Sequence, residues 1–406
     1  MKVLYVTGAC LTKNTSANMS HNGYIKGLLD NGCDVDIIMA NDSWGAEDTQ
    51  LRKWEHATYY EFDSVSFSDK LKKWFKKKRT KSLSAQPAKN KNDEIGCKKG
   101  GVFLGFRKLC KRSFYLMFKP DKIYPLNITW LRNAQNFRKE GVYDLVVSNS
   151  SPSASHKLVI NLTKADRIHY KRWVQIWEDP WYYDLYSDRN QLIKQEEHFL
   201  LQKATEIYYV SPLTQMYQQK FFPDCAEKMK CVPLPFLEFS DIEDNDIIEE
   251  NSFGYFGDYY SVTRNLAPFY HALKKMDCKG YIYGDTDINL ASNEKIQVNG
   301  RVTLDVLSKV QARVQVLVHL CNLKGGQIPG KIYHYSATNK PILFILDGTE
   351  EEQQRIKEFF SRFDRYVFCK NQEEDILMAM HNIVEGKIKY KIVEEFSPCN
   401  IVKKIL

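Results

Sequence analysis

The chain lacks several features that would place it in a simple class. No uncharged apolar run approaches the ~18–20 residues that cross a bilayer. Its ten cysteines form no CxxC pair, so a zinc site is not predicted and reduced, cytoplasmic thiols are expected. The apolar run over 2–7 is too short for the apolar part of a signal peptide and reads as a first buried strand. These absences favour a globular chain that works in the cytoplasm.

What is present is a composition that can build large cores. Hydrophobic residues make up 43% and charged residues 27% of 406 residues, a length that suits two domains. A strand over 2–7, a helix near 24–29 and a strand over 35–39 predict a parallel α/β sheet. The proline-containing, acidic stretch 231–251 is the predicted linker, and a second α/β unit follows it. We expect two Rossmann-like domains facing each other across a cleft.

The positive charge is concentrated in one segment. Residues 70–122 hold 18 Lys and Arg against three acids, a net of +15; the whole chain carries +8, so the remainder carries −7. Aromatic residues such as Trp74 and Phe75 are mixed with these cations. One interpretation is a basic insertion, at about 66–125, that lies on an anionic membrane surface. The other is a solvated basic loop followed by a core helix. No nucleic-acid motif accompanies the charge, so nucleic acid is not a predicted partner.

Polar loops follow three predicted strands of the first half. Ser150 lies in a turn after the strand over 143–148, Glu178 and Asp179 follow the strand over 172–177, and 211–212 follow the strand over 207–210. Ligands of parallel sheets bind beyond the carboxyl ends of strands, so these loops point to one cleft. Glu178 and Asp179 are candidates for catalysis, or else they cap and pair locally.

Two segments of the second half are suited to binding phosphate. A strand leads into Gly257 and a polar turn, with a helix expected from about Thr263, and Arg264 can clamp a phosphate. By itself this turn also fits a simple packing role. The second segment, 325–343, joins a Gly-rich loop to a short helix that begins near Lys331, a cation able to neutralise a diphosphate.

The run from Ile328 to Leu343 (IPGKIYHYSATNKPIL) closely resembles the donor-site segment of bacterial family-4 glycosyltransferases of the GT-B fold. Other pieces follow in the family's order, including the opening strand with Gly8 and the loop 177–181. The resemblance covers most of the chain except the basic insertion. It implies domains at 1–235, on the acceptor side, and 236–388, on the donor side. It also implies a helix within 389–406 that crosses back to the first domain.

The resemblance further implies transfer of a sugar from a nucleotide-sugar with retention of anomeric configuration and without a metal or other cofactor. The donor-side residues it implies are Gly257, Arg264, Ile328, Pro329, Gly330, Lys331, Tyr333 and His334. The acceptor-side candidates are Gly8, Asn18, His21 and Ser150. The family's paired glutamates are replaced here by Gly326 and His334.

The leading hypothesis is a peripheral enzyme on the inner face of the cytoplasmic membrane. It would extend a lipid-linked saccharide during capsule or O-antigen-type polysaccharide synthesis. Two alternatives remain: a nucleotide-sugar epimerase on the same fold, and a catalytically silent subunit that binds nucleotide-sugar. The loss of both donor carboxylates is the feature that favours the silent subunit.

Overall fold

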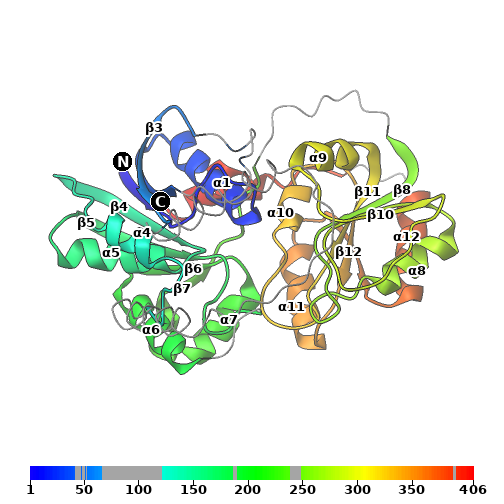
Figure 1. The fold of residues 1–406 in the computed structure, drawn as a ribbon. Coiled ribbons are helices and arrows are strands. Elements are labelled where there is room, and N and C mark those ends of the chain that lie inside the picture. Colours follow the sequence, from blue (N-terminus) through cyan, green and yellow to red (C-terminus); the bar gives the residue numbers. More distant parts are fainter. Residues whose placement is uncertain are drawn as a thin grey trace, which may run out of the picture.

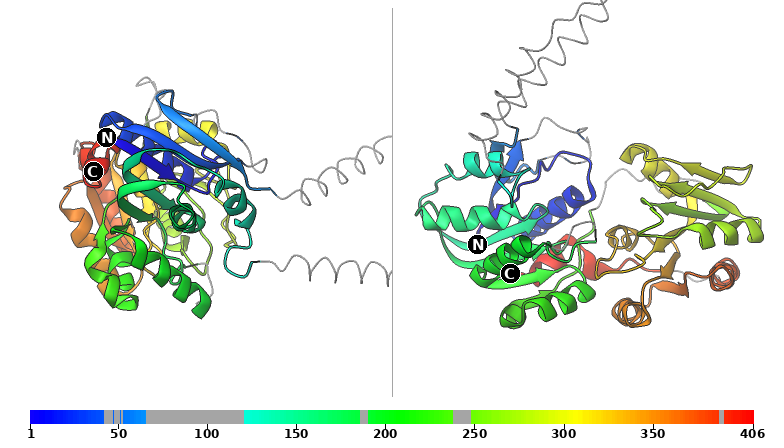
Figure 2. Two further views of the ribbon diagram at one scale, coloured as in Figure 1. Left: turned by 90° about the vertical axis from the view of Figure 1, so that its left-hand side faces the viewer. Right: turned by 60° about the horizontal axis from the view of Figure 1, so that its bottom comes forward.

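The computed structural model describes residues 1–41, 47, 51, 53–65, 121–185, 190–237, 248–386 and 390–406. Two α/β domains, each built on a parallel sheet, lie next to each other (Figures 1 and 2). Nearly all of the predicted basic insertion, residues 66–120, lies outside the described residues, so its membrane role stays a prediction. Among the residues that the structure does describe, no helix is both long and apolar enough to span a bilayer.

The first sheet has seven strands in the order β3-β2-β1-β4-β5-β6-β7, all parallel. They are β1 (Lys2–Val6), β2 (Asp34–Asn41), β3 (Ala57–Asp63), β4 (Val142–Ser150), β5 (His169–Trp177), β6 (Glu206–Tyr209) and β7 (Met229–Cys231). β1 is central and its last four residues are completely buried, which is why its sequence is continuously apolar rather than alternating.

Helices cover both faces of this sheet. They are α1 (Ser16–Asp30), α4 (Ile128–Ala134), α5 (Ala154–Lys164), α6 (Gln191–Lys203), α7 (Pro212–Phe221) and the 3₁₀ helix η1 (Pro223–Lys228). Side-chain oxygens fix two helix starts: Thr15 caps α1, and Ser211 caps α7 just before its proline.

The second sheet has six parallel strands in the order β10-β9-β8-β11-β12-β13. They are β8 (Glu249–Phe256), β9 (Lys279–Tyr283), β10 (Ile296–Asn299), β11 (Val314–Leu320), β12 (Ile342–Leu346) and β13 (Tyr366–Lys370). The accompanying helices are α8 (Ala267–Met276), α9 (Leu304–Arg313), α10 (Lys331–Tyr335), α11 (Glu350–Ser361) and α12 (Glu373–Glu385). In Figure 1, α10 and α11 lie on the side toward the first domain, and α8 and α12 lie on the opposite side.

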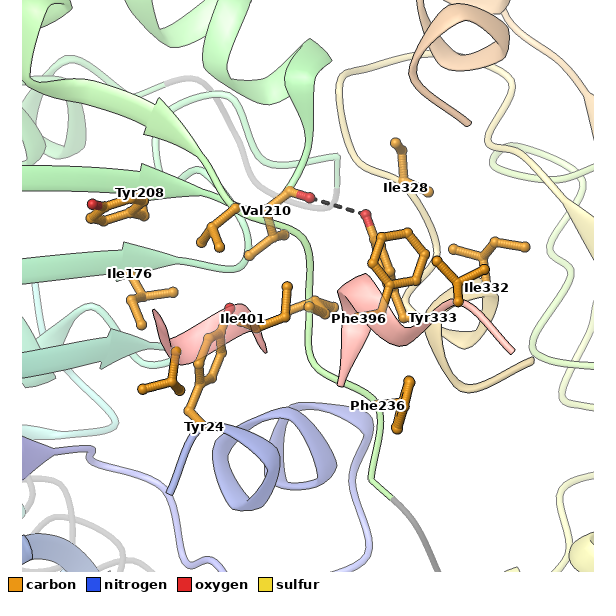
Figure 3. Close-up of a cluster of buried hydrophobic side chains, with 14 of the residues drawn as sticks. Tyr24, Ile176, Tyr208, Val210, Phe236, Ile328, Ile332, Tyr333, Phe396 and Ile401 are labelled. Carbon is orange, nitrogen blue, oxygen red and sulfur yellow. Dashed lines mark hydrogen bonds between the residues drawn. The ribbon is translucent and has the colours of Figure 1, made fainter. Parts of the chain in front are cut away.

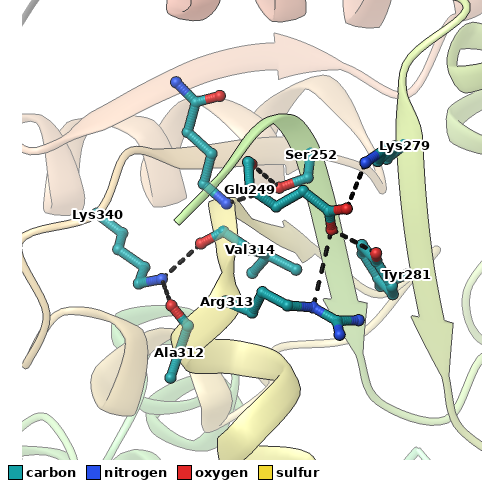
Figure 4. A network of polar contacts seen from close by, with 9 residues as sticks. Glu249, Ser252, Lys279, Tyr281, Ala312, Arg313, Val314 and Lys340 are labelled. Atoms are coloured by element: carbon teal, nitrogen blue, oxygen red, sulfur yellow. Dashed lines mark hydrogen bonds and ion pairs between the residues drawn. The ribbon is translucent and has the colours of Figure 1, made fainter. Parts of the chain in front are cut away.

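A polar network fastens the amino ends of three strands of this sheet (Figure 4). The Glu249 carboxylate on β8 accepts hydrogen bonds from Lys279 and from the Tyr281 hydroxyl on β9, and lies 3.8 Å from Arg313 Nε. Lys340 donates to the carbonyl oxygens of Ala312 and Val314 at the start of β11. This network therefore lies at the edge of the sheet opposite to the edge where ligands of parallel sheets bind.

The chain ends on the first domain. After the 3₁₀ helix η2 (Glu394–Phe396), α13 (Pro398–Lys403) packs on α1, and a side chain at Gly27 would lie 2.2 Å from the Pro398 carbonyl oxygen. Asn31 Nδ2 donates to the Cys399 carbonyl at 3.0 Å. The final segment is thus bound to the first domain after leaving the second (Figure 1).

An apolar core runs continuously between the domains (Figure 3). Val210 from the end of β6 lies opposite Ile332 and Tyr333 of α10, and the Tyr333 hydroxyl donates to the Val210 carbonyl at 3.1 Å. Phe396 and Ile401 of the closing segment fill the same core. Burial of such large side chains in one cluster stabilises this relative placement of the two domains.

One predicted boundary is wrong. The helix expected from about Thr263 begins at Ala267 instead, because Tyr260–Arg264 forms a separate turn in which the N–H groups of Thr263 and Arg264 both bond to the Tyr260 carbonyl. Pro268 lies in the first turn of α8, a position where its missing N–H costs nothing.

Candidate functional site

The carboxyl ends of β5, β6 and β8 bring the predicted loops to the junction between the domains. The Ser211 hydroxyl, at the end of β6, donates to the Gly326 carbonyl at 2.5 Å. The Gln327 amide donates to Asp179, just beyond β5, at 2.6 Å. The structure therefore joins the acidic loop of the first domain directly to the Gly-rich loop of the second.

The turn after β8 is held tightly against its neighbours. The N–H of Gly257 bonds to the Tyr283 carbonyl at 2.9 Å. A Cβ on Gly284, whose φ is +157°, would lie 2.0 Å from the Gly257 carbonyl oxygen. Gly284, which the sequence analysis did not identify, is thus required for the approach of the two loops.

Arg264 is oriented by two protein oxygens. Its Nε donates to Asn322 Oδ1 at 2.7 Å, and its Nη1 donates to the Asp258 carbonyl at 2.7 Å. Its Nη1 is also 4.0 Å from the position of a Cβ on Gly257. Arg264 and Gly257, which were predicted as parts of one phosphate site, are therefore adjacent.

Two further cations share this region. Lys331 is the first residue of α10 and is partly buried. Burial lowers the pKa of Lys331 to about 8. The negative charge of Asp258 opposes this shift, and the positive charges of Arg301 and Arg264 add to it. Arg301 forms an ion pair with Asp258 and lies 3.6 Å from Asp285. Arg301 was missed in the sequence because it follows the short edge strand β10 and no motif surrounds it.

Several donor-side candidates also join the domains. Ile328 and Tyr333 are buried in the interdomain core, and a Cβ on Gly330 would approach Leu234 at 3.1 Å. Burial lowers the pKa of His334 to about 4, so this imidazole is neutral, and its Nδ1 accepts from the Leu237 N–H at 3.4 Å. Contact of these residues and of Pro329 with a donor stays a prediction.

The two candidate acids have different surroundings. Glu178 is buried, and its pKa lies well above the usual value. Burial is the main cause and the neighbouring Asp179 adds to it, while a hydrogen bond from Asn149 acts in the opposite direction. Asp179 remains accessible to water, but desolvation by the surrounding protein raises its pKa. The Gln327 hydrogen bond opposes this shift, and the nearby Asp184 adds to it. Glu178 thus keeps its proton to a higher pH than an exposed glutamate does.

The acceptor-side candidates lie near the carboxyl ends of β1 and β4: Gly8 in the loop after β1, Asn18 and His21 on α1, and Ser150 at the end of β4. His21 is enclosed between Tyr5 and Thr7, with Tyr5 Oη 2.8 Å from its Nδ1, and burial lowers its pKa to about 4. Asn18 Nδ2, on α1, donates to the Cys10 and Lys13 carbonyls of the loop after β1. Contact of these two side chains with an acceptor stays a prediction.

Gly8 allows Pro152 to pack closely, because a Cβ there would lie 2.7 Å from Pro152 Cγ. Ser150 Oγ is buried and finds no hydrogen-bond partner among the described residues. The direct acceptor contacts expected of Gly8 and Ser150 stay predictions.

One group of potential metal ligands lies apart from this cleft. His198 on α6 faces Asp224 and Cys225 of η1, with ligand atoms within 4.8 Å of one another. His198 Nε2 lies 2.7 Å from Asp224 Oδ2. The expectation that the reaction needs no metal stays a prediction.

Comparison with known proteins gives structural matches alone. No family model and no curated protein matches the chain. The HepE protein of Anabaena, solved in complex with UDP-glucose, superposes with a TM-score of 0.53 at 13% identity, over 100% of this chain and 94% of that one. The UDP-GlcNAc 2-epimerase of Methanocaldococcus jannaschii gives 0.50 at 11% identity, over 100% and 99% of the two chains.

The chain has the GT-B fold. Two parallel-sheet α/β domains and full-length superposition confirm the predicted fold class. At these identities the matches establish architecture, and the chemistry of the cleft has to be argued from its residues.

Proposed function

We propose that the chain is a glycosyltransferase that takes a sugar from a nucleoside-diphosphate donor bound in the GT-B cleft. The observation that carries the proposal is the convergence of Arg264, Arg301 and Lys331 beside the Gly257 turn. Departure of a nucleoside diphosphate develops negative charge on phosphate oxygens, and fixed cations stabilise such charge. The UDP-glucose complex of the HepE protein supports a nucleotide-sugar as the ligand class.

The acids of the first domain complete the proposed site. Asp179 accepts a hydrogen bond from Gln327 of the second domain, and the buried Glu178 precedes it in the chain. In the proposed reaction Asp179 contacts the acceptor hydroxyl or the oxocarbenium-like transition state, and Glu178 supplies a hydrogen bond. Retention of configuration and metal independence follow from the sequence resemblance. The proposal also includes a lipid-linked acceptor and a location on the inner face of the cytoplasmic membrane.

The close packing around Gly326 supports a second candidate function. A side chain at Gly326 would meet the Thr214 backbone nitrogen at 2.8 Å, so this loop has no room for the glutamate that the resembling family carries. Without that carboxylate, a silent subunit that binds nucleotide-sugar without turning it over is the alternative function.

Calorimetry with UDP tests the binding half of the proposal. Arg264→Ala and Lys331→Ala should each weaken UDP binding by about 1–3 kcal/mol, as expected for loss of a charge-assisted contact. Lys309→Ala, an exposed lysine of α9, is the matched control and should bind UDP normally. Unchanged affinity in both cleft variants would remove the cations from the site.

Product analysis tests the reaction. Hydrolysis or transfer of a nucleotide-sugar in a panel of UDP- and GDP-sugars supports the transferase. UDP binding without any turnover favours the silent subunit, and a released epimer identifies an epimerase.

A further inference from the structure

The side chain of Gln327, in the second domain, forms hydrogen bonds with the acidic loop of the first domain, at residues 179–185. Its Nε2 donates to Asp179 Oδ1 at 2.6 Å and lies 3.3 Å from Asp184 Oδ1. Its Oε1 accepts from the Leu185 backbone N–H at 2.8 Å. Both ends of the amide are therefore used to hold the segment that carries the candidate acids.

The backbone beside Gln327 is fixed from both domains. The Gly326 carbonyl accepts from the Ser211 and Thr214 hydroxyls, at 2.5 and 2.9 Å. The Gln327 carbonyl accepts from Asn322 Nδ2 at 2.9 Å. With the main chain held on both sides, the direction of the Gln327 side chain is set before any ligand binds.

The same contacts lead to the candidate phosphate clamp. Asn322 uses its other amide atom, Oδ1, to accept from Arg264 Nε at 2.7 Å. A chain of hydrogen bonds thus connects Asp179 in the first domain, through Gln327 and Asn322, to Arg264 in the second.

We infer that Gln327 is a positioning residue that aims the Asp179 carboxylate into the cleft and links its position to that of Arg264. This inference rests on the proposed transfer reaction. The amide can donate to the carboxyl group whether or not Asp179 is protonated, so Oδ1 is occupied and Oδ2 is left to contact a ligand. Through Asn322, a shift of the acidic loop also shifts the clamp.

The surroundings of Asp179 predict the direction in which its pKa should change when Gln327 is replaced. Burial raises the pKa of Asp179, the Gln327 hydrogen bond lowers it, and the nearby acid Asp184 raises it. Gln327→Glu keeps the shape and replaces that donor with a third acid. The pKa of Asp179 should then rise further, and the acidic limb of the pH profile of kcat should move to higher pH.

Kinetics separate positioning from folding. With the fastest nucleotide-sugar of the panel, Gln327→Glu should lower kcat at pH 7 by about tenfold or more while KM for the donor changes much less. Gln354→Glu is the matched control, because Gln354 also donates to a carboxylate, that of Glu358, but on the exposed surface of α11. The control should leave both constants and the pH profile unchanged.

A swap of the two partners completes the test. In the double variant Asp179→Asn with Gln327→Glu, the hydrogen bond can form with its polarity reversed. Thermal melts should therefore show a loss of Tm in Gln327→Glu at pH 7.5 that is recovered in the double variant. Because the raised pKa of Asp179 favours the folded state when the carboxyl is protonated, the loss in Gln327→Glu should shrink at pH 4.5. Turnover should stay low in the double variant, since the carboxylate is gone.

The outcomes are distinct. Recovery of Tm without recovery of turnover supports the inference. Recovery of turnover along with Tm, or an unmoved acidic limb in Gln327→Glu in an active enzyme, overturns it and leaves the proposed function standing. A wild-type chain that binds UDP but turns over no nucleotide-sugar overturns the transferase function, and the positioning role with it.

Discussion

Replacing Gly326 with alanine should separate the domains at the cleft. The new Cβ would lie 2.8 Å from the Thr214 nitrogen, 2.9 Å from the Leu213 carbonyl carbon and 3.0 Å from Thr214 Cα. All three atoms belong to the backbone at the start of α7, so no side chain can rotate away and the loop or the helix has to move.

The cost has two parts. Overpacking a tight contact costs about 1–3 kcal/mol. Moving the loop also strains the hydroxyl bonds of Ser211 and Thr214 to the Gly326 carbonyl, each worth about 0.5–1.5 kcal/mol. We expect a total loss of about 2–6 kcal/mol at the interface, the upper value applying if both bonds are lost, which for domains of this size lowers Tm by several degrees or more.

Differential scanning calorimetry measures the effect against a matched control. Gly300→Ala adds the same methyl group where its nearest described neighbour is Asp285 Oδ1 at 3.8 Å, an ordinary contact. Gly300→Ala should melt like the wild type. If Gly326→Ala is equally stable, the close approach of α7 to the Gly-rich loop is wrong. The explanation for the missing glutamate would fail with it.

Two further predictions follow from the charges. Since the pKa of Lys331 is lowered to about 8, UDP affinity should be constant near pH 7 and fall above pH 8, by up to about tenfold per pH unit. Lys331→Arg, which stays charged, should remove that dependence; a flat wild-type profile would show that Lys331 does not contact the diphosphate. From the sequence, glutamine in place of the cations between 70 and 81 should release the protein from anionic vesicles in sedimentation, and persistent binding would refute the membrane role.

Local patterns in the sequence predicted the parts of the fold that have a strong local signal. The short helix α10 begins at Lys331, as the Gly-rich loop before it indicated. The buried strands β1 and β4 each contain a short apolar run and were predicted for that reason. The edge strand β10 alternates weakly between buried and exposed residues over only four positions, so no pattern indicated it.

The candidate site was only partly predictable. The structure brings Gly257, Arg264 and Lys331, which local motifs indicated, into one region, and their contact with a phosphate stays a prediction. Arg301 and Gln327 could not be assigned, because each acquires its role from a partner more than forty positions away in the chain. The one feature of the sequence that could have indicated Gln327 is its position between a Gly pair and Ile328. A polar side chain at that position needs a hydrogen-bond partner at the domain junction.

The most direct test of the central claim is a crystal structure of the protein with UDP. The diphosphate should lie beside the Gly257 turn, with phosphate oxygens within hydrogen-bond distance of Arg264 and Lys331. UDP bound elsewhere, or bound in the cleft with both side chains directed away from the phosphates, would contradict that claim.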